Sequence, residues 1–308
     1  MNKTQLAVVL GLGESGWAAV QWLQARNITV RVHDTRPFPP YLEALQTQYP
    51  QVTFRSGTWT AADFSDADYL VVSPGIAIAQ PAIAATAARG VPVVGDVELF
   101  AQALDEAKWS GQLIAITGSN GKSTVTEMVG HICRRVGKRT CVAGNIGLPV
   151  LTAVQAAQTG GNWPEVYVLE LSSFQLETTR SLRCDAATVL NVSEDHLDRY
   201  EGQMRLYAAA KARIFNQARY QVLNREDEYS QGMANEALPM SSFGLNTPPS
   251  ATAWGLQTTE EGLTLAYGEQ HYLPVKRLPV AGLHNAANAL AALALTSAIG
   301  IDPQAAAL

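Results

Sequence analysis

The sequence contains few cysteines, no basic excess and no apolar run long enough to cross a bilayer. Cys133, Cys141 and Cys184 are far apart and lack the spacing of a metal site, so they favour a reduced, cytoplasmic protein with buried thiols. The net charge of −5 provides no basic surface for nucleic acid. The first apolar segment runs directly into a glycine motif, which is unlike a signal peptide. We therefore expect neither nucleic-acid binding nor membrane insertion.

The composition that remains is that of a globular α/β protein. Of the 308 residues, 47% are apolar and 16% are charged, which allows a sizeable core, and this length suggests two domains. Strand-like apolar runs alternate with helical patterns, without internal repeats. We expect a Rossmann-like domain over residues 1–95. A second domain over residues 96–308 should form a doubly wound, mostly parallel sheet. From Met240 to Pro274 the pattern changes to short strand-like runs separated by glycine and proline, which predicts a small antiparallel edge of this sheet.

A glycine motif follows the first predicted strand, Leu6–Leu10. Gly11, Gly13 and Gly16 form a GxGxxG pattern between this strand and a predicted helix over residues 15–26. Asp34 follows the next predicted strand, at about the distance at which an acidic residue meets a ribose in dinucleotide-binding folds. The motif indicates a pyrophosphate-bearing ligand, of which NAD is one alternative. Alternatively, the motif could be a strand–helix turn that binds no ligand.

The strongest motif is TGSNGKST at residues 117–124, which follows an apolar strand at Leu113–Ile116 and precedes a predicted helix. Glycines allow backbone N–H groups to surround phosphate oxygens, and the helix N-terminus favours negative charge. Lys122 would reach the β- and γ-phosphates and the Ser123 hydroxyl would bind Mg²⁺. Only two residues separate Gly118 from Gly121, whereas the common phosphate loop has four at this place.

Polar side chains follow several strands of the second domain. Glu170 could hold Mg²⁺ or cap a helix. His196 could be a second metal ligand, although a lone histidine is more often structural; its strand should lie beside the strand of the phosphate loop. Asn145 could bind substrate or cap its loop.

Three further side chains lie on predicted helices. Asn285 and Asn288 are three residues apart and could recognise an adenine edge or cap the helix. Composition alone makes Lys211 a solvated helix residue.

Taken together, these segments resemble one family, the Mur ligases of peptidoglycan synthesis. The resemblance rests on GLGESG, SPGIA, TGSNGKST, GNIGLP, ELSSFQLE, NVSEDHLDRY, the lysine of YAAAKARIF, and GLHNAANALAA, which occur in the family's order over nearly the whole chain. The short spacing of the phosphate loop is shared by this family.

The resemblance implies roles by position. The first domain would hold the UDP part of a substrate rather than NAD, and the UDP-substrate residues would be Ser15, Asp34, Thr35, Arg36, Ser73, Gly75, Asn145, Ser172 and Gln175. The ATP-binding residues would be Gly118, Ser119, Asn120, Gly121, Lys122, Ser123, Thr124, Asn285 and Asn288. The Mg²⁺ ligands would be Ser123, Glu170, His196 and Lys211, the last if carbamylated, and the catalytic residues Lys122, His196 and Lys211.

The implied reaction is ATP-driven amide-bond formation, which adds D-glutamate to UDP-N-acetylmuramoyl-L-alanine through an acyl phosphate. It would serve cell-wall synthesis, and with it cell shape and division, in the cytoplasm. The family's third domain supplies the D-glutamate site, and nothing here corresponds to it. Because the chain stops at Leu308 within one turn of a predicted helix, we expect a truncated, monomeric form that binds the UDP substrate and turns over poorly.

Three other interpretations remain. One is another ligase of this family or an enzyme like folylpolyglutamate synthetase, against which the N-terminal nucleotide turn argues. An NAD-dependent dehydrogenase would leave TGSNGKST without a role. A non-catalytic nucleotide-binding module is the third.

Overall fold

The computed structural model describes residues 5–307, and the chain divides into two compact units. Unit 1 comprises Met1–Trp109, Leu148–Asn162 and Phe174–Leu182, and unit 2 comprises Ser110–Gly147, Trp163–Ser173 and Arg183–Leu308. Unit 1 is thus discontinuous, because it takes two segments from the middle of the chain. The domain boundary at residue 95 remains a prediction.

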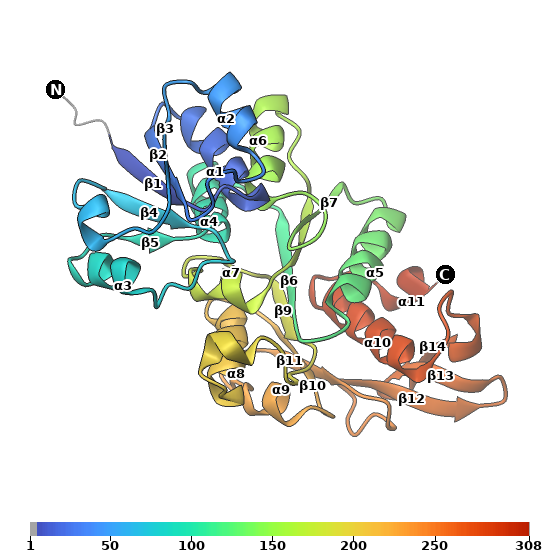
Figure 1. The fold of residues 1–308 in the computed structure, drawn as a ribbon. Coiled ribbons are helices and arrows are strands. Elements are labelled where there is room, and N and C mark those ends of the chain that lie inside the picture. The colour runs from blue at the N-terminus through green and yellow to red at the C-terminus, as the bar shows by residue number, and fades with distance from the viewer. Residues whose placement is uncertain (1–4, 308) are drawn as a thin grey trace. The chain divides into compact units, whose positions relative to one another are not determined.

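Unit 1 is built on a five-stranded parallel sheet in the order β3-β2-β1-β4-β5 (Figure 1). The strands are β1 (Leu6–Leu10), β2 (Thr29–Asp34), β3 (Thr53–Ser56), β4 (Tyr69–Val72) and β5 (Val93–Val94). Its helices are α1 (Glu14–Gln24), α2 (Leu42–Gln48), the 3₁₀ turn η1 (Ala61–Phe64), α3 (Pro81–Ala88), α4 (Asp96–Glu106) and α6 (Val150–Gly160). α7 (Ser173–Glu177) begins at the junction of the two units and continues into unit 1.

The core of unit 1 explains why its strands read as continuous apolar runs. Val8, Leu10 and Leu70 are fully buried with Phe64, because helices cover the sheet and leave no solvated face. On the other face α1, α4 and α6 pack together. The burial of both faces fixes the sheet edge at which the strands end.

Unit 2 is built on a nine-stranded sheet in the order β14-β13-β12-β11-β10-β9-β6-β8-β7. The strands are β6 (Gln112–Thr117), β7 (Thr140–Gly144), β8 (Val166–Glu170), β9 (Ala186–Val189), β10 (Gln221–Asn224), β11 (Met240–Phe243), β12 (Ala253–Thr259), β13 (Gly262–Tyr267) and β14 (Gln270–Pro274). The fold is therefore α/β, with one parallel sheet and one mostly parallel sheet that has an antiparallel edge, as the sequence predicts.

The antiparallel edge begins later than the change of pattern at Met240 suggests. β11 pairs parallel with β10, and β12 pairs parallel with β11. Only the pairs β12–β13 and β13–β14 are antiparallel. Short strands between glycines and prolines indicate an edge, but their direction depends on how the connecting loops return.

The helices of unit 2 include two long ones that pack against each other, α5 (Lys122–Arg135) and α10 (Leu283–Ala298) (Figure 1). The shorter ones are η2 (Leu197–Tyr200), α8 (Met204–Ala212), η3 (Arg213–Phe215), α9 (Glu228–Gly232), η4 (Val275–Arg277) and α11 (Pro303–Ala307); Leu308, on which a predicted turn ends, lies outside the described residues. Buried Val129 of α5 and Leu290 of α10 belong to one core with Ile116 of β6. This core holds the start of α5 at the end of β6.

Within the described residues, no helix has both the length and the apolar character needed to span a membrane.

Candidate functional site

In unit 1, the turn between β1 and α1 is too tight for side chains at two of its glycines. A Cβ on Gly16 would lie 1.9 Å from the carbonyl oxygen of Gly11. Gly11 has a φ of +87°, and its N–H donates to the carbonyl of His33 at 2.7 Å. Such close backbone approach at a helix N-terminus leaves N–H groups facing a ligand site.

The carboxylate of Asp34 fixes this turn from the neighbouring strand. It accepts the Leu12 N–H at 2.7 Å, and the Arg36 guanidinium donates to both its oxygens, Nε to Oδ1 at 2.9 Å and Nη2 to Oδ2 at 2.7 Å. Burial favours the neutral form, but these hydrogen bonds outweigh it and keep the pKa of Asp34 below its usual value. Asp34 therefore shapes the turn and is already engaged on both oxygens.

The other predicted UDP-substrate residues are distributed over the two units. Ser73 follows β4 and its hydroxyl donates to the Gly11 carbonyl at 3.2 Å. Thr35 and Gly75 are exposed, whereas Ser172, in unit 2, is half-buried after β8. These placements leave the predicted substrate contacts open to a ligand without testing them.

A buried carboxyl that the sequence analysis overlooked connects two of the predicted residues. Asp96, at the start of α4, is hydrogen-bonded to the Ser15 hydroxyl and accepts from Gln175 Nε2 at 3.3 Å. Burial raises the pKa of Asp96 although these hydrogen bonds oppose the rise. Ser15 and Gln175, 160 positions apart in sequence, are thereby held at one place in unit 1.

In unit 2, the carboxyl ends of four adjacent strands form the predicted ATP edge. In the sheet, Ile116 on β6 is opposite Glu170 on β8, and Gly144 on β7 is opposite Glu170 on its other side. β9 lies on the opposite side of β6 and ends beside Thr117. The strand before His196 thus neighbours the strand of the phosphate loop, as predicted, and all four ends meet where α/β proteins bind ligands.

Two lysines converge on the phosphate loop. Lys122 Nζ donates to the carbonyl oxygens of Gly118 at 3.0 Å and Ser119 at 2.9 Å, and Lys211 Nζ donates to the same Gly118 oxygen at 2.8 Å. Lys211 is 2% exposed and lies 4.4 Å above the Tyr207 ring. The structure therefore places Lys211 in the site rather than in solvent.

The environment of Lys211 disfavours its charged form. Burial, followed by the charge of Lys122, lowers the pKa of Lys211 to about 7, and Asp195 opposes the shift. A fraction of this amine is thus neutral near neutral pH, and a neutral amine is the nucleophilic form.

Glu170 is positioned to hold a cation. Its side chain is 1% exposed, and Oε1 accepts from Asn145 Nδ2 at 2.7 Å. Among the described residues, its Oε2 is buried and has no hydrogen-bond partner. A buried carboxylate oxygen without a partner is costly unless a cation occupies the site, so the residues present fit a divalent metal such as Mg²⁺.

Unlike the buried Glu170, His196 lies at the surface. It is exposed, has a left-handed φ of +52°, and lies 3.5 Å from the Asp195 carboxylate. No group of three or more histidine, cysteine or acidic side chains that could hold a metal occurs in the described part of the chain. The predicted set of Ser123, Glu170, His196 and carbamylated Lys211 contains only two such side chains, so its metal role remains a prediction.

The predicted asparagine pair lies at the start of α10. Asn285 Nδ2 donates to the Ala281 carbonyl at 2.7 Å, and Asn288 Nδ2 donates to Asn285 Oδ1 at 3.4 Å. A Cβ on Gly121 would lie 2.7 Å from Asn288 Oδ1, so Asn288 touches the phosphate loop. The pair does not cap the helix, because neither side chain accepts a backbone N–H of its first turn, and it borders the predicted nucleotide site.

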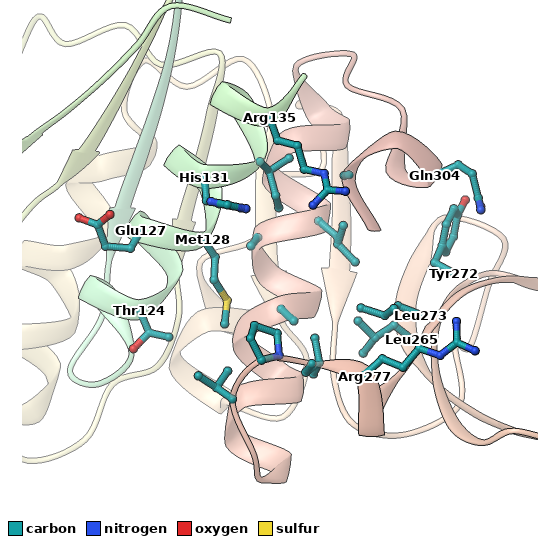
Figure 2. A pocket seen from close by; sticks show the side chains of 18 residues that line it. Thr124, Glu127, Met128, His131, Arg135, Leu265, Tyr272, Leu273, Arg277 and Gln304 are labelled. Carbon is teal, nitrogen blue, oxygen red and sulfur yellow. The ribbon is translucent and has the colours of Figure 1, made fainter. Parts of the chain in front are cut away.

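A cavity of about 810 Å³ extends along α5 and α10 (Figure 2). Thr124, Met128 and Arg135 lie along α5 on one wall, while Tyr272 of β14 and Arg277 of η4 line the cavity from the end of the antiparallel edge. The cavity therefore starts at the last residue of the phosphate motif.

Comparison with known proteins identifies the family. The Mur ligase middle domain matches residues 116–296, which hold most of unit 2, and the Mur ligase MurD-like N-terminal domain matches residues 5–95. The chain belongs to the Mur ligase family.

Two curated relatives share about half of its residues. The UDP-N-acetylmuramoylalanine–D-glutamate ligase of Methylobacillus flagellatus is 51% identical over 300 residues, and that of Thiobacillus denitrificans is 49% identical over 309 residues. Each alignment covers 97% of this chain and 64% of the relative. The chain thus spans less than two thirds of the length of the relatives it matches.

Solved structures agree with this fold. The ligase from Neisseria meningitides that joins UDP-N-acetylmuramate to L-alanyl-gamma-D-glutamyl-meso-diaminopimelate aligns with a TM-score of 0.63 at 17% identity, covering 99% of this chain and 97% of that chain. The UDP-N-acetylmuramate-alanine ligase of Thermotoga maritima aligns with a TM-score of 0.55 at 20% identity, covering 99% and 67%. At these identities the likeness concerns the fold alone.

Proposed function

We propose that the protein to which this chain corresponds is a cytoplasmic, ATP-dependent ligase that adds D-glutamate to UDP-N-acetylmuramoyl-L-alanine in peptidoglycan synthesis. The observation that carries the proposal is the convergence of Lys122 and Lys211 on the Gly118 carbonyl. Lys122 places positive charge at a helix N-terminus, and Lys211 lies beside it on the same loop oxygen, an arrangement that suits a nucleoside triphosphate. The names of the relatives at about 50% identity supply the particular substrates.

The loop would bind the triphosphate as follows. The N–H groups in the first turn of α5 have no partner within the helix and would donate to phosphate oxygens. On nucleotide binding, Lys122 would exchange its two loop carbonyls for the β- and γ-phosphates. Thr124 and Asn288 border the loop, so the nucleoside would enter the cavity at its Thr124 end.

Glu170 and Ser123 would hold Mg²⁺, with His196 and carbamylated Lys211 as further ligands. When bound, the metal would neutralise charge on the transferring phosphoryl group. Carbamylation adds CO₂ to the neutral amine of Lys211 and releases one proton, which turns the neutral side chain into an anion. The lowered pKa of Lys211, which burial causes, supports this step.

Catalysis would consist of positioning and charge stabilisation. The substrate carboxylate would attack the γ-phosphorus to give an acyl phosphate with loss of ADP, and the D-glutamate amine would then displace phosphate. Lys122 would stabilise charge on the transferred group, and Asn145, held by Glu170, would orient the substrate at the same edge.

In unit 1, the UDP part would bind at the turn between β1 and α1. Both Asp34 oxygens already accept hydrogen bonds from Leu12 and Arg36, so the acid that an NAD site would offer to a ribose is engaged. This favours a UDP ligand, which would meet the exposed Thr35 beside the Asp34–Arg36 pair.

Calorimetric titration of this chain tests the proposal. We expect saturable binding of UDP-N-acetylmuramoyl-L-alanine and, separately, of Mg-ATP, with no binding of NAD at the same concentrations. Binding of NAD in place of the UDP substrate would overturn the proposal. Intact-mass measurement in bicarbonate should show a gain of one CO₂ that Lys211→Met abolishes and Lys276→Met, at an exposed lysine, does not.

A further inference from the structure

Asn191, the second residue after β9, is hydrogen-bonded to the phosphate loop through both its side chain and its backbone. Its Oδ1 accepts the Asn120 N–H at 2.8 Å, and its Nδ2 donates to the Asn120 carbonyl at 3.0 Å. Its own backbone carbonyl accepts the Ser119 N–H at 2.9 Å. One residue thus fixes both peptide groups at the tip of the loop.

A second anchor lies two residues further on. The Ser119 hydroxyl donates to the Ser193 carbonyl at 3.0 Å and accepts the Ser193 N–H at 3.0 Å. Asn120 Nδ2 also donates to Ser193 Oγ at 3.2 Å. The side chains of Ser119 and Asn120 therefore face this segment, and so do their N–H groups.

Asn191 is itself held from behind by β10 and α9. On one side, Asn224 Nδ2 donates to the Leu190 carbonyl at 2.8 Å. On the other, the Val192 N–H donates to Asp227 Oδ2 at 3.0 Å, while Asp227 Oδ1 caps α9 by accepting the Ser230 N–H at 2.8 Å. Both peptide groups that flank Asn191 are fixed, so its amide is presented to the loop from a rigid base.

In this arrangement the backbone N–H groups of the loop have two separate roles. The N–H groups of Ser119 and Asn120 are used to hold the loop, while those at the start of α5 face the ligand. Gly121, with a φ of +80°, is intrinsically flexible, and ordering such a loop only on binding would weaken affinity.

We propose that Asn191 is a positioning residue, which holds the phosphate loop in its nucleotide-binding conformation before the nucleotide arrives. The proposal rests on the proposed function of unit 2 as a nucleotide site. It assigns Asn191 no contact with nucleotide, because both polar atoms of its side chain are engaged by Asn120.

Hydrogen–deuterium exchange of the ligand-free chain tests the positioning role directly. In Asn191→Ala, we expect the amide of Asn120 to exchange about tenfold faster or more, because it loses its hydrogen-bond acceptor, the Asn191 Oδ1. The amides of β6 and α5 should exchange as in the wild type. Unchanged exchange at Asn120 would overturn the proposal.

Titration with Mg-ATP supplies the functional readout. For Asn191→Ala we expect a Kd about tenfold weaker than wild type. The Kd for the UDP substrate should be unchanged, which a general loss of structure would not give. The exposed Asn216→Ala is the matched control and should leave both constants unchanged.

A third variant keeps the test decisive if Asn191→Ala fails to fold. Asn191→Asp retains the acceptor for the Asn120 N–H but lacks the donor to its carbonyl. We expect it to fold, to retain the protection of the Asn120 amide, and to bind Mg-ATP more weakly than wild type. Wild-type affinity in Asn191→Asp, together with unchanged exchange, would refute the proposal. A wild-type chain that does not bind Mg-ATP would instead refute the proposed function, and the exchange experiment would still decide whether Asn191 holds the loop.

Discussion

The two units each contain a strand, a glycine turn and a helix N-terminus, yet they stabilise the turn with opposite chemistry. In unit 1 an anion holds the turn, since Asp34 accepts the Leu12 N–H and is balanced by Arg36. In unit 2 the neutral Asn191 holds the turn, and Lys122 supplies positive charge. Backbone geometry can therefore be shared while the charge of the supporting residue differs with the ligand.

The difference fits the ligands proposed for each turn. A diphosphate that is bound but not broken needs N–H donors and shape, and a buried acid behind the turn is tolerated because Arg36 neutralises it. A triphosphate whose phosphoryl group is transferred needs cations at the turn itself. An acid in the place of Asn191 would oppose those cations.

The largest expected effect concerns the backbone contact of the first turn. Gly16→Ala should lower the free energy of unfolding by about 3 kcal/mol or more, because its Cβ would overlap the Gly11 carbonyl. Gly13→Ala is the matched control: Gly13 has a φ of −87° and open space around a Cβ, so the change should be within about 0.5 kcal/mol. Urea denaturation measures both, and equal stability of the two variants would contradict the close contact.

The second-largest expected effect concerns the positive charge of Lys122 at the phosphate loop. Lys122→Met should weaken Mg-ATP binding by about 100-fold, because charge-assisted hydrogen bonds to phosphate are lost. UDP-substrate binding should be unchanged. Calorimetric titration measures both, with Lys276→Met as the control at an exposed lysine. A Lys122→Met chain with wild-type affinity for Mg-ATP would show that Lys122 does not bind phosphate.

A third prediction concerns Lys211 and pH. Its folded pKa is about 7, whereas the pKa of an unfolded lysine is about 10.4, so between these values the unfolded state binds more protons. The free energy of unfolding should therefore rise by about 2 kcal/mol from pH 7 to pH 9 relative to that of Lys211→Met. Denaturation curves at several pH values measure this slope. Identical slopes in wild type and Lys211→Met would show that Lys211 is not buried as an amine.

The smallest effect concerns the acid behind the first turn. The pKa of Asp34 is lowered in the folded state, because the hydrogen bonds of Arg36 and Leu12 outweigh burial. Its contribution to stability is thus present above the unfolded pKa of about 3.9 and is lost as the pH falls through the lower folded value. Asp34→Asn should cost about 1 kcal/mol at pH 7 and progressively less below pH 4.

Asp66→Asn is the control for this acid. It removes a carboxylate that also binds an arginine, Arg31, at 2.8 Å, but Asp66 is 59% exposed. The expected change is within about 0.5 kcal/mol, because exposed ion pairs contribute little. If Asp66→Asn cost as much as Asp34→Asn, the first turn would not depend on its acid.

The sequence predicts the parts of the fold that have strong local signals. Both glycine turns, their strands and their helices occur where the patterns indicate, because apolar period and turn chemistry are local properties. α2, β3, α6 and α7 were not predicted. The direction of β11 was predicted wrongly: β11 lies in the stretch expected to be antiparallel but pairs parallel with β10, because pairing direction depends on distant partners.

The candidate site was predictable only in part. Lys122 and Glu170 stand out by their positions after strands. Lys211 could be placed only by resemblance, because a lysine among alanines gives no sign of burial. The roles of Asn191 and Asp96 could not be predicted from the sequence, since they depend on groups more than 70 positions away, the backbone of Asn120 for Asn191 and the Gln175 side chain for Asp96.

The discontinuous first unit has a consequence for synthesis on the ribosome. Its sheet can pair once β5 has emerged, but the Glu98 carboxylate of α4 accepts the N–H groups of Arg180 and Ser181, at 2.7 Å and 3.0 Å. Those residues emerge only after the phosphate loop and three strands of the second sheet have been translated. The N-terminal sheet of the nascent chain therefore stays incompletely covered while the second sheet begins to fold. During this interval its exposed apolar surface would most need a chaperone.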